Sequence, residues 1–291
     1  MESPTASHPP PAGDRRSRIL AGLGAGEGRR GVLIAVVSTI VVFALIAVVV
    51  VRSPGWDEVK NAFFDGQVFR QSFPEVLRVF KENIRIFCIA EAIVLVAALF
   101  LAVLRSLPGP VFFPIRLLSI VYADVFRGIP TLLLIYMLGF GAPALGIAWL
   151  PSSQLFWGIV ALVLVYTAYV SEVYRAGIES VHPSQGAAAR SLGLSRAQAM
   201  RYVVLPQAVR RVIPPLLNDF IGLQKDSALI SVLGIVEALR QAQIDSAATF
   251  NYTPFVAVAL LFLVITIPLT RLTDWLIGRD RRRRQASGAA A

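Results

Sequence analysis

Long apolar stretches with little or no charge recur along this sequence and predict helices that cross a membrane. A hydrocarbon core about 30 Å thick is spanned by roughly 20 apolar residues in a helix. The clearest stretch, Val32–Val51, has no charged residue. Further stretches follow at Ile84–Leu104, Ile115–Phe140, Leu155–Ile178, Val212–Ala238 and Thr253–Ile277. The pattern predicts an all-α fold, a polytopic membrane helical bundle of about six transmembrane helices.

Proline and charge interrupt several of these stretches. Because lipid cannot satisfy exposed backbone polar groups, interrupted helices must face protein or water. Polar and ionisable residues inside the stretches are therefore functional candidates. They are Glu91 in the second stretch and Asn218, Lys225 and Asp226 in the fifth. For Lys225 and Asp226 the alternative interpretation is that the two charges neutralise each other at a helix break.

Composition and charge placement agree with a membrane protein. The chain is 56% hydrophobic and 16% charged, whereas soluble domains are about a quarter charged. Its formal net charge of +10 raises the question of a nucleic-acid partner, but the arginines gather at the ends of the apolar stretches. Cytoplasmic flanks collect Lys and Arg, so we expect both termini in the cytoplasm of a cell whose inner or plasma membrane holds the chain. No nucleic acid is expected as a partner.

The same patterns divide the chain into five parts. Residues 1–31, rich in Pro, Gly, Ser and Arg, are expected to form a disordered cytoplasmic tail. An extra N-terminal transmembrane helix at 32–51 follows, with no small-residue cleavage site after it. Residues 52–83 mix charges with aromatics and are expected to form an extracytoplasmic segment. A core domain at 84–278 and a basic cytoplasmic tail at 279–291 complete the chain.

Two segments echo each other, each placing an acid three residues before an arginine. The first pairs Asp124 with Arg127, and the second pairs Glu172 with Arg175. On a helix this spacing lets the two side chains meet. Charges in membrane segments are costly unless paired or hydrated, so we expect both pairs to face the bundle interior or its cytoplasmic edge. They then act either in gating and transport or only in locking the packing of the helices.

Residues 184–206 have the pattern of two short helices joined by a turn. Ser184 is a good N-cap, and Gly193 suits the left-handed conformation that ends a helix. Ser195 and Gln198 have the spacing of a capping box for the second helix, and Pro206 is expected to mark its end or a kink. The alternative for Gly193 is an ordinary loop glycine. A compact hairpin of this kind, within residues 180–206, suits docking onto another protein.

Four motifs, found in the expected order along the chain, resemble the permease subunits of binding-protein-dependent ABC importers. One of them lies in the hairpin, where Ala188-Ala189-Arg-Ser-Leu-Gly193 precedes Val203-Val-Leu205-Pro206. Three flanking motifs are similar to the polar amino-acid branch, which includes histidine, glutamine and arginine permeases. They are Phe126-Arg127-Gly128-Ile-Pro130, Glu172-Val-Tyr-Arg175-Ala-Gly177, and Lys225-Asp226-Ser227-Ala-Leu-Ile-Ser-Val-Leu-Gly234. The resemblance covers about Asn83 to Gly278.

One position departs from the family pattern. Relatives usually have glutamate where this chain has Ala187. With Ser184 as N-cap, residue 187 is the third residue of the helix, where glutamate completes a capping box. We therefore expect the start of this helix to be weaker by about 0.5–1 kcal/mol. Any charged contact that relatives make from this position is also lost.

The resemblance implies a core like that of type I ABC importer permeases and a role for each motif. Residues implied to couple the chain to an ATPase are Ser184, Ala187, Ala188, Ala189, Gly193, Leu205 and Pro206. Candidates for gating or for the pathway are Glu91, Asp124, Arg127, Gly128, Pro130, Glu172, Arg175, Gly177, Asn218, Lys225, Asp226 and Ser227.

The resemblance also implies partners. They are a cytoplasmic ABC ATPase dimer that binds ATP and Mg²⁺, a second copy of the permease or a homologous permease, and an extracytoplasmic substrate-binding protein. The mixed charges in the spans fit a zwitterionic amino acid as substrate. The chain itself has no nucleotide-binding motif, because the glycines at 22–28 lack a preceding strand and a following Gly-Lys-Ser/Thr. We therefore expect the chain to hold no cofactor and no metal.

Two other function classes account for parts of the same pattern. A secondary amino-acid transporter driven by an ion gradient is the alternative, with Glu91, Asp124 or Asp226 as its coupling site. A membrane enzyme is disfavoured, because His8 and His182 are the only histidines and the sequence shows no constellation for a metal or a nucleophile. A dependence of uptake on ATP or on a cation gradient distinguishes the importer from the secondary transporter.

Overall fold

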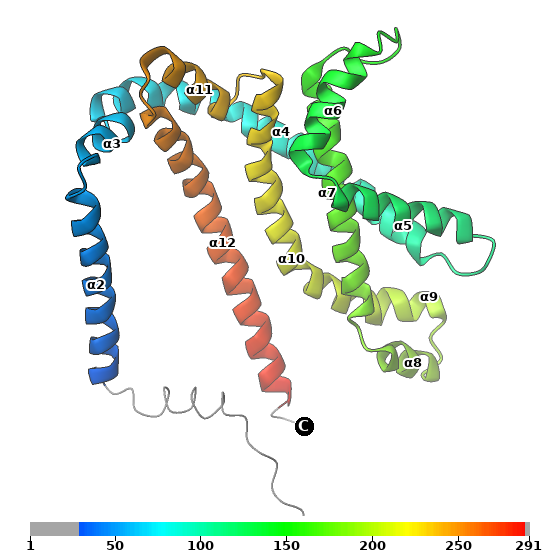
Figure 1. Ribbon diagram of the computed structural model, residues 1–291. Helices are drawn as coiled ribbons and strands as arrows, with labels where there is room; N and C mark the ends of the chain where they lie inside the picture. Colours follow the sequence, from blue (N-terminus) through cyan, green and yellow to red (C-terminus); the bar gives the residue numbers. More distant parts are fainter. Residues whose placement is uncertain (1–28, 289–291) are drawn as a thin grey trace, which may run out of the picture. The chain divides into compact units, whose positions relative to one another are not determined.

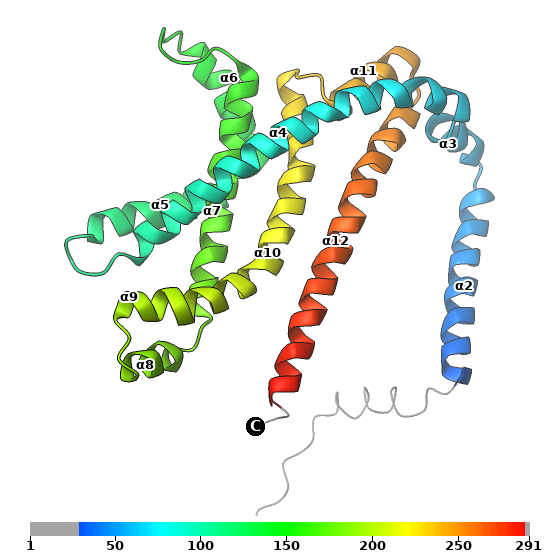
Figure 2. The same ribbon diagram turned by 180° about the vertical axis from the view of Figure 1, so that it is seen from behind.

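A computed structural model describes residues 29–288, whose ribbon is drawn in Figures 1 and 2. Every regular element in that range is a helix, so the predicted all-α class is confirmed. Four helices among these residues are long and apolar enough to cross a membrane, and there are up to six spans if each of two bent helix pairs is one span. The expected disordered tail lies outside the described residues except for 29–31, which are helical.

The chain divides into two compact units, with the boundary between Lys60 and Asn61. The described part of the first unit contains α2 (Arg29–Val51) and the beginning of α3 (Trp56–Phe63). From Leu33 to Val51 the side chains of α2 are exposed. The hydroxyls of Ser38 and Thr39 both donate to the carbonyl of Ala35, at 3.0 and 2.7 Å. The two hydroxyl groups of this apolar helix are thus satisfied within the helix, as lipid requires.

The second unit begins with a helix that is anchored at its first turn. In α4 (Gly66–Ser106) the carboxylate of Asp65 accepts hydrogen bonds from the N–H groups of Gln67 and Val68. The N–H of Asp65 donates to Thr253 Oγ1 at 3.1 Å, at the start of α12 (Thr253–Gly288). The helix then runs for 41 residues without a break. The expected border between residues 83 and 84 therefore does not coincide with a helix end.

The main core gathers around α7 (Gln154–Glu179), which packs against α4, α5 (Phe113–Gly128), α6 (Thr131–Ala144) and α10 (Leu205–Asp226). Small residues let these helices approach closely. Ala90 and Ala98 of α4 are fully buried, and so is Ala161 of α7. A second core cluster joins α4, α11 (Ala238–Thr249) and α12. Both clusters lie within the second unit, so the region that carries the motifs is one packed body.

Two of the predicted spans are bent. The helices α5 and α6 meet at 102°, and Ile129 and Pro130 are the two residues between them. Proline cannot donate a backbone hydrogen bond, and it disfavours helical geometry in the residue before it. The other bend, of 49°, separates α11 from the preceding helical run, which ends in the 3₁₀ helix η2 (Ser227–Leu233). Gly234 follows η2 with φ of 80°, a conformation that glycine adopts without strain.

Candidate functional site

The hairpin at residues 180–206 connects α7 to α10 and contains α8 (Pro183–Ser191) and α9 (Arg196–Ala199). Both views of the ribbon show α8 and α9 side by side at the end of α7 and α10 that lies away from α11 (Figures 1 and 2). Of the predicted ATPase-coupling residues, Ala189 is buried. The others are exposed, namely Ser184, Ala187, Ala188, Gly193, Leu205 and Pro206. Ala199 of α9 is also buried.

The predicted start of the first hairpin helix is wrong by two residues. The N-cap is His182, whose Nδ1 accepts a hydrogen bond from the N–H of Ser184 at 3.3 Å. Pro183 occupies the first helical position, where a missing N–H costs nothing and a fixed φ suits the helix. Ser184 is therefore the second helical residue and Ala187 the fifth. Glutamate at 187 would not complete a capping box, so the expected weakening of the helix start at this position does not apply.

The predicted end of the same helix is confirmed. Gly193 has φ of 89°, in the left-handed region. Its N–H donates to the carbonyl of Arg190 at 3.0 Å, and the N–H of Leu194 donates to the carbonyl of Ala189 at 3.2 Å. This pair of bonds is a Schellman motif, which satisfies carbonyls that the helix end leaves free. The turn between the two helices is thus set by hydrogen bonds that need a positive φ at residue 193.

The second hairpin helix starts as predicted and continues further than predicted. Ser195 Oγ accepts from the N–H of Gln198 and Gln198 Oε1 accepts from the N–H of Ser195, which confirms the capping box. A π-helical segment, η1 (Met200–Val204), then leads directly into α10. The N–H of Leu205 reaches back five residues to the carbonyl of Met200. Pro206 therefore does not end the helical run. It lies in the first turn of α10, directly after the widened π turn.

The hairpin is held closely to the spans on both sides. Gly177 of α7 is buried against α10, and a Cβ added there would lie 2.0 Å from Cγ1 of Val212. Only a residue without a side chain permits this approach. Arg211 of α10 donates to the carbonyl and, at 3.1 Å, to the hydroxyl of Ser180. The chain segments that enter and leave the hairpin, the end of α7 and the start of α10, are therefore joined at its base.

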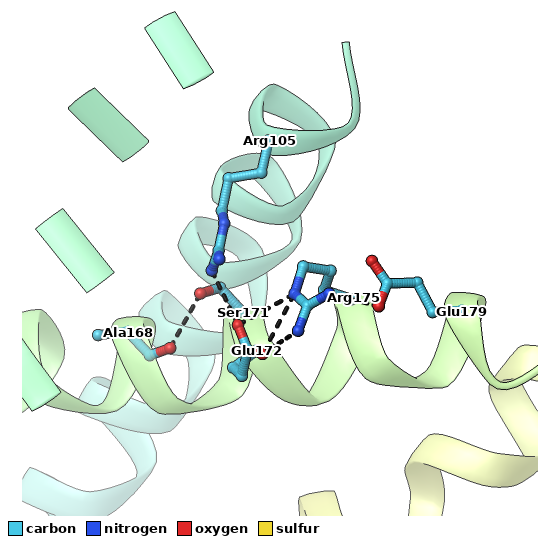
Figure 3. Close-up of polar contacts among 6 residues, drawn as sticks. All are labelled: Arg105, Ala168, Ser171, Glu172, Arg175 and Glu179. Atoms are coloured by element: carbon cyan, nitrogen blue, oxygen red, sulfur yellow. Dashed lines mark hydrogen bonds and ion pairs between the residues drawn. The ribbon is translucent and has the colours of Figure 1, made fainter. Parts of the chain in front are cut away.

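A network of charged groups lies on α7 just before the hairpin (Figure 3). Arg105, at the end of α4, donates to Glu172 Oε2 at 2.9 Å. Arg175 donates through Nε to both oxygens of Glu172 at 3.1 Å and also pairs with Glu179. The predicted pair of Glu172 and Arg175 is present. The contribution of Arg105 was missed, because 67 residues separate it from Glu172 and only a local spacing is readable in the sequence.

The other predicted pair does not form in the part of the chain that the structure describes. Asp124 and Arg127 are both exposed on α5, and no ion pair joins them. The guanidinium of Arg127 lies instead 5.7 Å from the ring centre of Tyr169, on α7. The phenolic oxygen of Tyr169 also lies 3.4 Å from the carbonyl oxygen of Arg127, to which it donates. Attraction of the cation to the aromatic face favours this arrangement over the exposed acid.

Among the polar residues of the fifth stretch, which the structure describes in full, Lys225 and Asp226 do not form the ion pair that the alternative interpretation of mutual neutralisation implies. Lys225 is exposed. Asp226 accepts a hydrogen bond from Tyr166 of α7 at 2.9 Å. Ser227 is fully buried and donates to the carbonyl of Gln224. Asn218 is exposed, and Glu91 of α4 is partly buried.

One buried polar cluster was not predicted. Glu237 is 0% exposed and caps α11, accepting from the N–H groups of Leu239 and Arg240. Asn83 of α4, 1% exposed, donates to Glu237 Oε2 at 2.6 Å and accepts from the N–H of Ala238 at 3.0 Å. Asn83 and Glu237 are 154 positions apart in the sequence, so no local spacing indicates this contact. The sequence did contain one signal for this helix start, because Glu237 follows shortly after an apolar run that ends at Gly234.

Comparison with known proteins gives consistent matches. The model of the family described as binding-protein-dependent transport system inner membrane component matches residues 95–282. The probable glutamine ABC transporter permease protein GlnM of Bacillus subtilis is 40% identical over 167 residues, which are 57% of this chain and 76% of that protein. The arginine transport system permease protein ArtQ of the same species is 37% identical over 150 residues, 51% of this chain and 68% of that protein.

Solved structures give the same match in three dimensions. The crystal structure of an amino acid ABC transporter with histidines contains a chain that is 33% identical, with a TM-score of 0.67. The match covers 74% of this chain and 98% of that chain. The inward-facing MetNI methionine ABC transporter, 20% identical with a TM-score of 0.56, shares the fold.

Proposed function

The chain belongs to the family of inner membrane components of binding-protein-dependent transport systems, in the polar amino-acid branch of ABC permeases, and from this we propose how it works. It is a multi-pass membrane component of an ABC amino-acid importer, in a permease family that lacks ATPase activity. In our proposal the chain forms the translocation pathway and couples it to a separate ATPase through the hairpin at residues 180–206.

The geometry of the hairpin is the observation that carries the coupling proposal. Its two helices are fixed by a Schellman turn at Gly193 and by a capping box at Ser195. Its base is fixed by the contact of Gly177 with Val212. A rigid hairpin joined at its base to two membrane helices moves with them when a partner moves it. This rigidity is what transmission of a displacement requires, since flexible loops absorb it.

The proposed assembly follows the predicted topology. Both termini face the cytoplasm, so the hairpin meets a cytoplasmic ABC ATPase dimer that binds ATP and Mg²⁺. A second copy of the chain or a homologous permease completes the membrane part, and an extracytoplasmic binding protein delivers the substrate. Residues 84–278 form the core, with 32–51 as an added membrane helix, 52–83 outside the cell and 279–291 as a basic cytoplasmic tail.

The proposed substrate is a polar or charged L-amino acid. Glu91, Asp219 and Asp226 lie on α4 and α10, which pack together with α7 in the bundle. Within the described residues, Asp219 Oδ2 and Gln224 Nε2 are buried with no hydrogen-bond partner. Buried polar atoms without partners are costly, so a polar substrate group that bonds to them as it passes offsets part of this cost.

Uptake by the reconstituted assembly tests the proposal. The chain, its ATPase and its binding protein are placed in liposomes, and entry of labelled glutamine, arginine and histidine is measured. We expect uptake that needs ATP and the binding protein and that persists when ionophores collapse the cation gradients. Uptake driven by a cation gradient without ATP contradicts the importer mechanism, and transport of only sugars, metals or phosphate contradicts the amino-acid substrate.

A further inference from the structure

Positive charge without acids marks the hairpin and the start of the helix that follows it. Residues 180–218 contain five arginines, no lysine and no Asp or Glu. None of these arginines forms an ion pair with an acid among the residues that the structure describes. Arg190, Arg196 and Arg201 belong to the hairpin itself and are exposed. The hairpin therefore presents three cations that no acid in the described part of the chain neutralises.

A single large apolar side chain stands between these cations at the turn. Leu192 is 82% exposed and immediately precedes Gly193. The Schellman bonds fix the backbone on both sides of it, so the exposure of Leu192 is set by the turn rather than by a loose loop. A fixed leucine in water is an unfavourable arrangement that burial in a partner relieves.

The rest of the outward surface of α8 is small and polar. Its exposed residues are Pro183, Ser184, Gln185, Ala187, Ala188, Arg190 and Ser191. A helix that lies on a bilayer needs a broad apolar face with large side chains, which α8 does not have. Small side chains permit a partner to approach the helix closely. This surface is therefore suited to a protein cleft rather than to lipid.

We propose that the hairpin fits a partner surface made of an apolar socket for Leu192 with a rim of carboxylates that faces Arg190, Arg196 and Arg201. The inference rests on the proposed function, in which the partner is the ATPase subunit. Arginine and large apolar side chains are the residues that dominate interface energies when they are well seated. The rim charges set recognition and the rate of association, and the socket sets how long the complex lasts.

The residue that departs from the family pattern is consistent with such a rim. Ala187 is exposed on the same helix as Arg190. A carboxylate at 187 would face the proposed acidic rim, where like charges repel and suppress binding. In this chain Ala187→Glu should therefore weaken docking of the ATPase. The uncharged Ala187→Gln has a side chain of the same length and is the matched control. Any steric effect of the longer side chain is common to both variants, so the weaker docking of Ala187→Glu relative to Ala187→Gln measures the effect of the charge.

The test measures how much ATPase subunit of the same importer stays with the purified permease complex. For the wild-type complex we expect about tenfold weaker association when KCl rises from about 50 to about 500 mM, because salt screens exposed charges. The triple change of Arg190, Arg196 and Arg201 to Glu should remove the ATPase at low salt. The variant with the same three residues changed to Gln should retain the ATPase at an intermediate level, and this retention should no longer depend on salt. Leu192→Ser should speed dissociation at every salt concentration.

Three outcomes contradict the inference, and they differ from failure of the proposed function. Salt-independent retention, together with full retention by the triple Glu variant, shows that the arginines do not face carboxylates, while the coupling function stands. Stronger binding by Ala187→Glu contradicts the acidic rim. An arginine effect seen in phosphatidylglycerol nanodiscs but not in phosphatidylcholine nanodiscs assigns the arginines to lipid. A wild-type chain that retains no ATPase under any condition instead contradicts the proposed function.

Discussion

Arg105 and Glu172 form an ion pair at 2.9 Å between the end of α4 and α7 (Figure 3). The side chain of Arg105 is only 13% exposed. Because Glu172 also binds Arg175, and α7 leads directly into the hairpin, this pair connects α4 to the helix that carries the hairpin. In the proposed mechanism, a displacement of the hairpin therefore reaches α4 as well as α7 and α10.

A double-mutant cycle should show that the ion pair of Arg105 with Glu172 contributes to the free energy of unfolding. Arg105→Gln leaves Glu172 with Arg175 alone, and Glu172→Gln leaves both arginines without their shared acid. Each single change should lower the stability of the chain in reversible SDS unfolding, since a partly buried charge loses its partner. The double variant should lose less than the sum, with an interaction energy of about 1 kcal/mol. Simple additivity would mean that the two side chains do not stabilise each other.

The positive φ of Gly193 predicts a functional defect without loss of the protein. In Gly193→Val the side chain resists the left-handed conformation by roughly 1 kcal/mol or more, so the turn should shift and misdirect Leu192 and α9. The membrane helices do not depend on this turn. We expect normal accumulation in the membrane, measured by immunoblot, and an ATPase rate that no longer responds to substrate and binding protein.

Another hairpin glycine provides the control. Gly186 lies inside α8 without a positive φ, and a Cβ there meets only Val204 Cγ2 at 3.9 Å. Gly186→Ala should keep full coupling and slightly stabilise the helix. If Gly193→Val also kept full coupling and transport, then the turn would not position a docking surface.

The approach of α7 to α10 at Gly177 predicts a steric defect that can be repaired. Gly177→Ala places a methyl group 2.0 Å from Val212 Cγ1, so the helices must separate or the side chains must leave their rotamers. The expected loss of stability, on the order of 1–3 kcal/mol, should appear as a lower melting temperature of the detergent-solubilised chain.

Removal of the opposing side chain tests the cause. The double variant Gly177→Ala with Val212→Ala should recover most of the lost stability, because the two methyl groups then share the space. Gly141→Ala in α6 is the neutral control, since a Cβ there meets nothing within 4 Å. A double variant less stable than both single variants would show that the contact in the structure is not the source of the defect.

Local patterns explain which parts of this architecture the sequence predicts. The capping box of Ser195 with Gln198, the turn at Gly193 and the pair of Glu172 with Arg175 each involve residues within a few positions, where helix geometry fixes the distance. The error at Ser184 has a local cause too. Both His182 and Ser184 can cap a helix, and the preference of proline for the first helical position decides between them.

Contacts between distant residues explain what the sequence does not predict. Arg105 meets Glu172, and Asn83 meets Glu237, only because α4 crosses both α7 and α11. No spacing in the chain encodes those crossings. The exposed pair of Asp124 and Arg127 shows the reverse problem, in which a favourable spacing is overruled by an aromatic ring from another helix. The same limit applies to the bend of 102° between α5 and α6, since Pro130 indicates a break but not its angle.

The buried cluster at the start of α11 predicts that substitution of Asn83 lowers the stability of the chain. Comparing Asn83→Leu with Asn83→Asp separates the loss of hydrogen bonds from the repulsion between charges. In Asn83→Leu the carboxylate of Glu237 and the N–H of Ala238 each lose their hydrogen bond to Asn83, and unpaired buried groups cost about 1–3 kcal/mol each, more when charged. We expect a chain that unfolds at markedly lower SDS concentration. Asn83→Asp should be worse, because a second carboxylate then faces Glu237. Combining Asn83→Asp with Glu237→Gln should recover part of the loss, since the amide donates to the new acid while its oxygen still caps α11. If Asn83→Leu and wild type unfold alike, then water reaches Glu237 and the cluster does not hold α11 against α4.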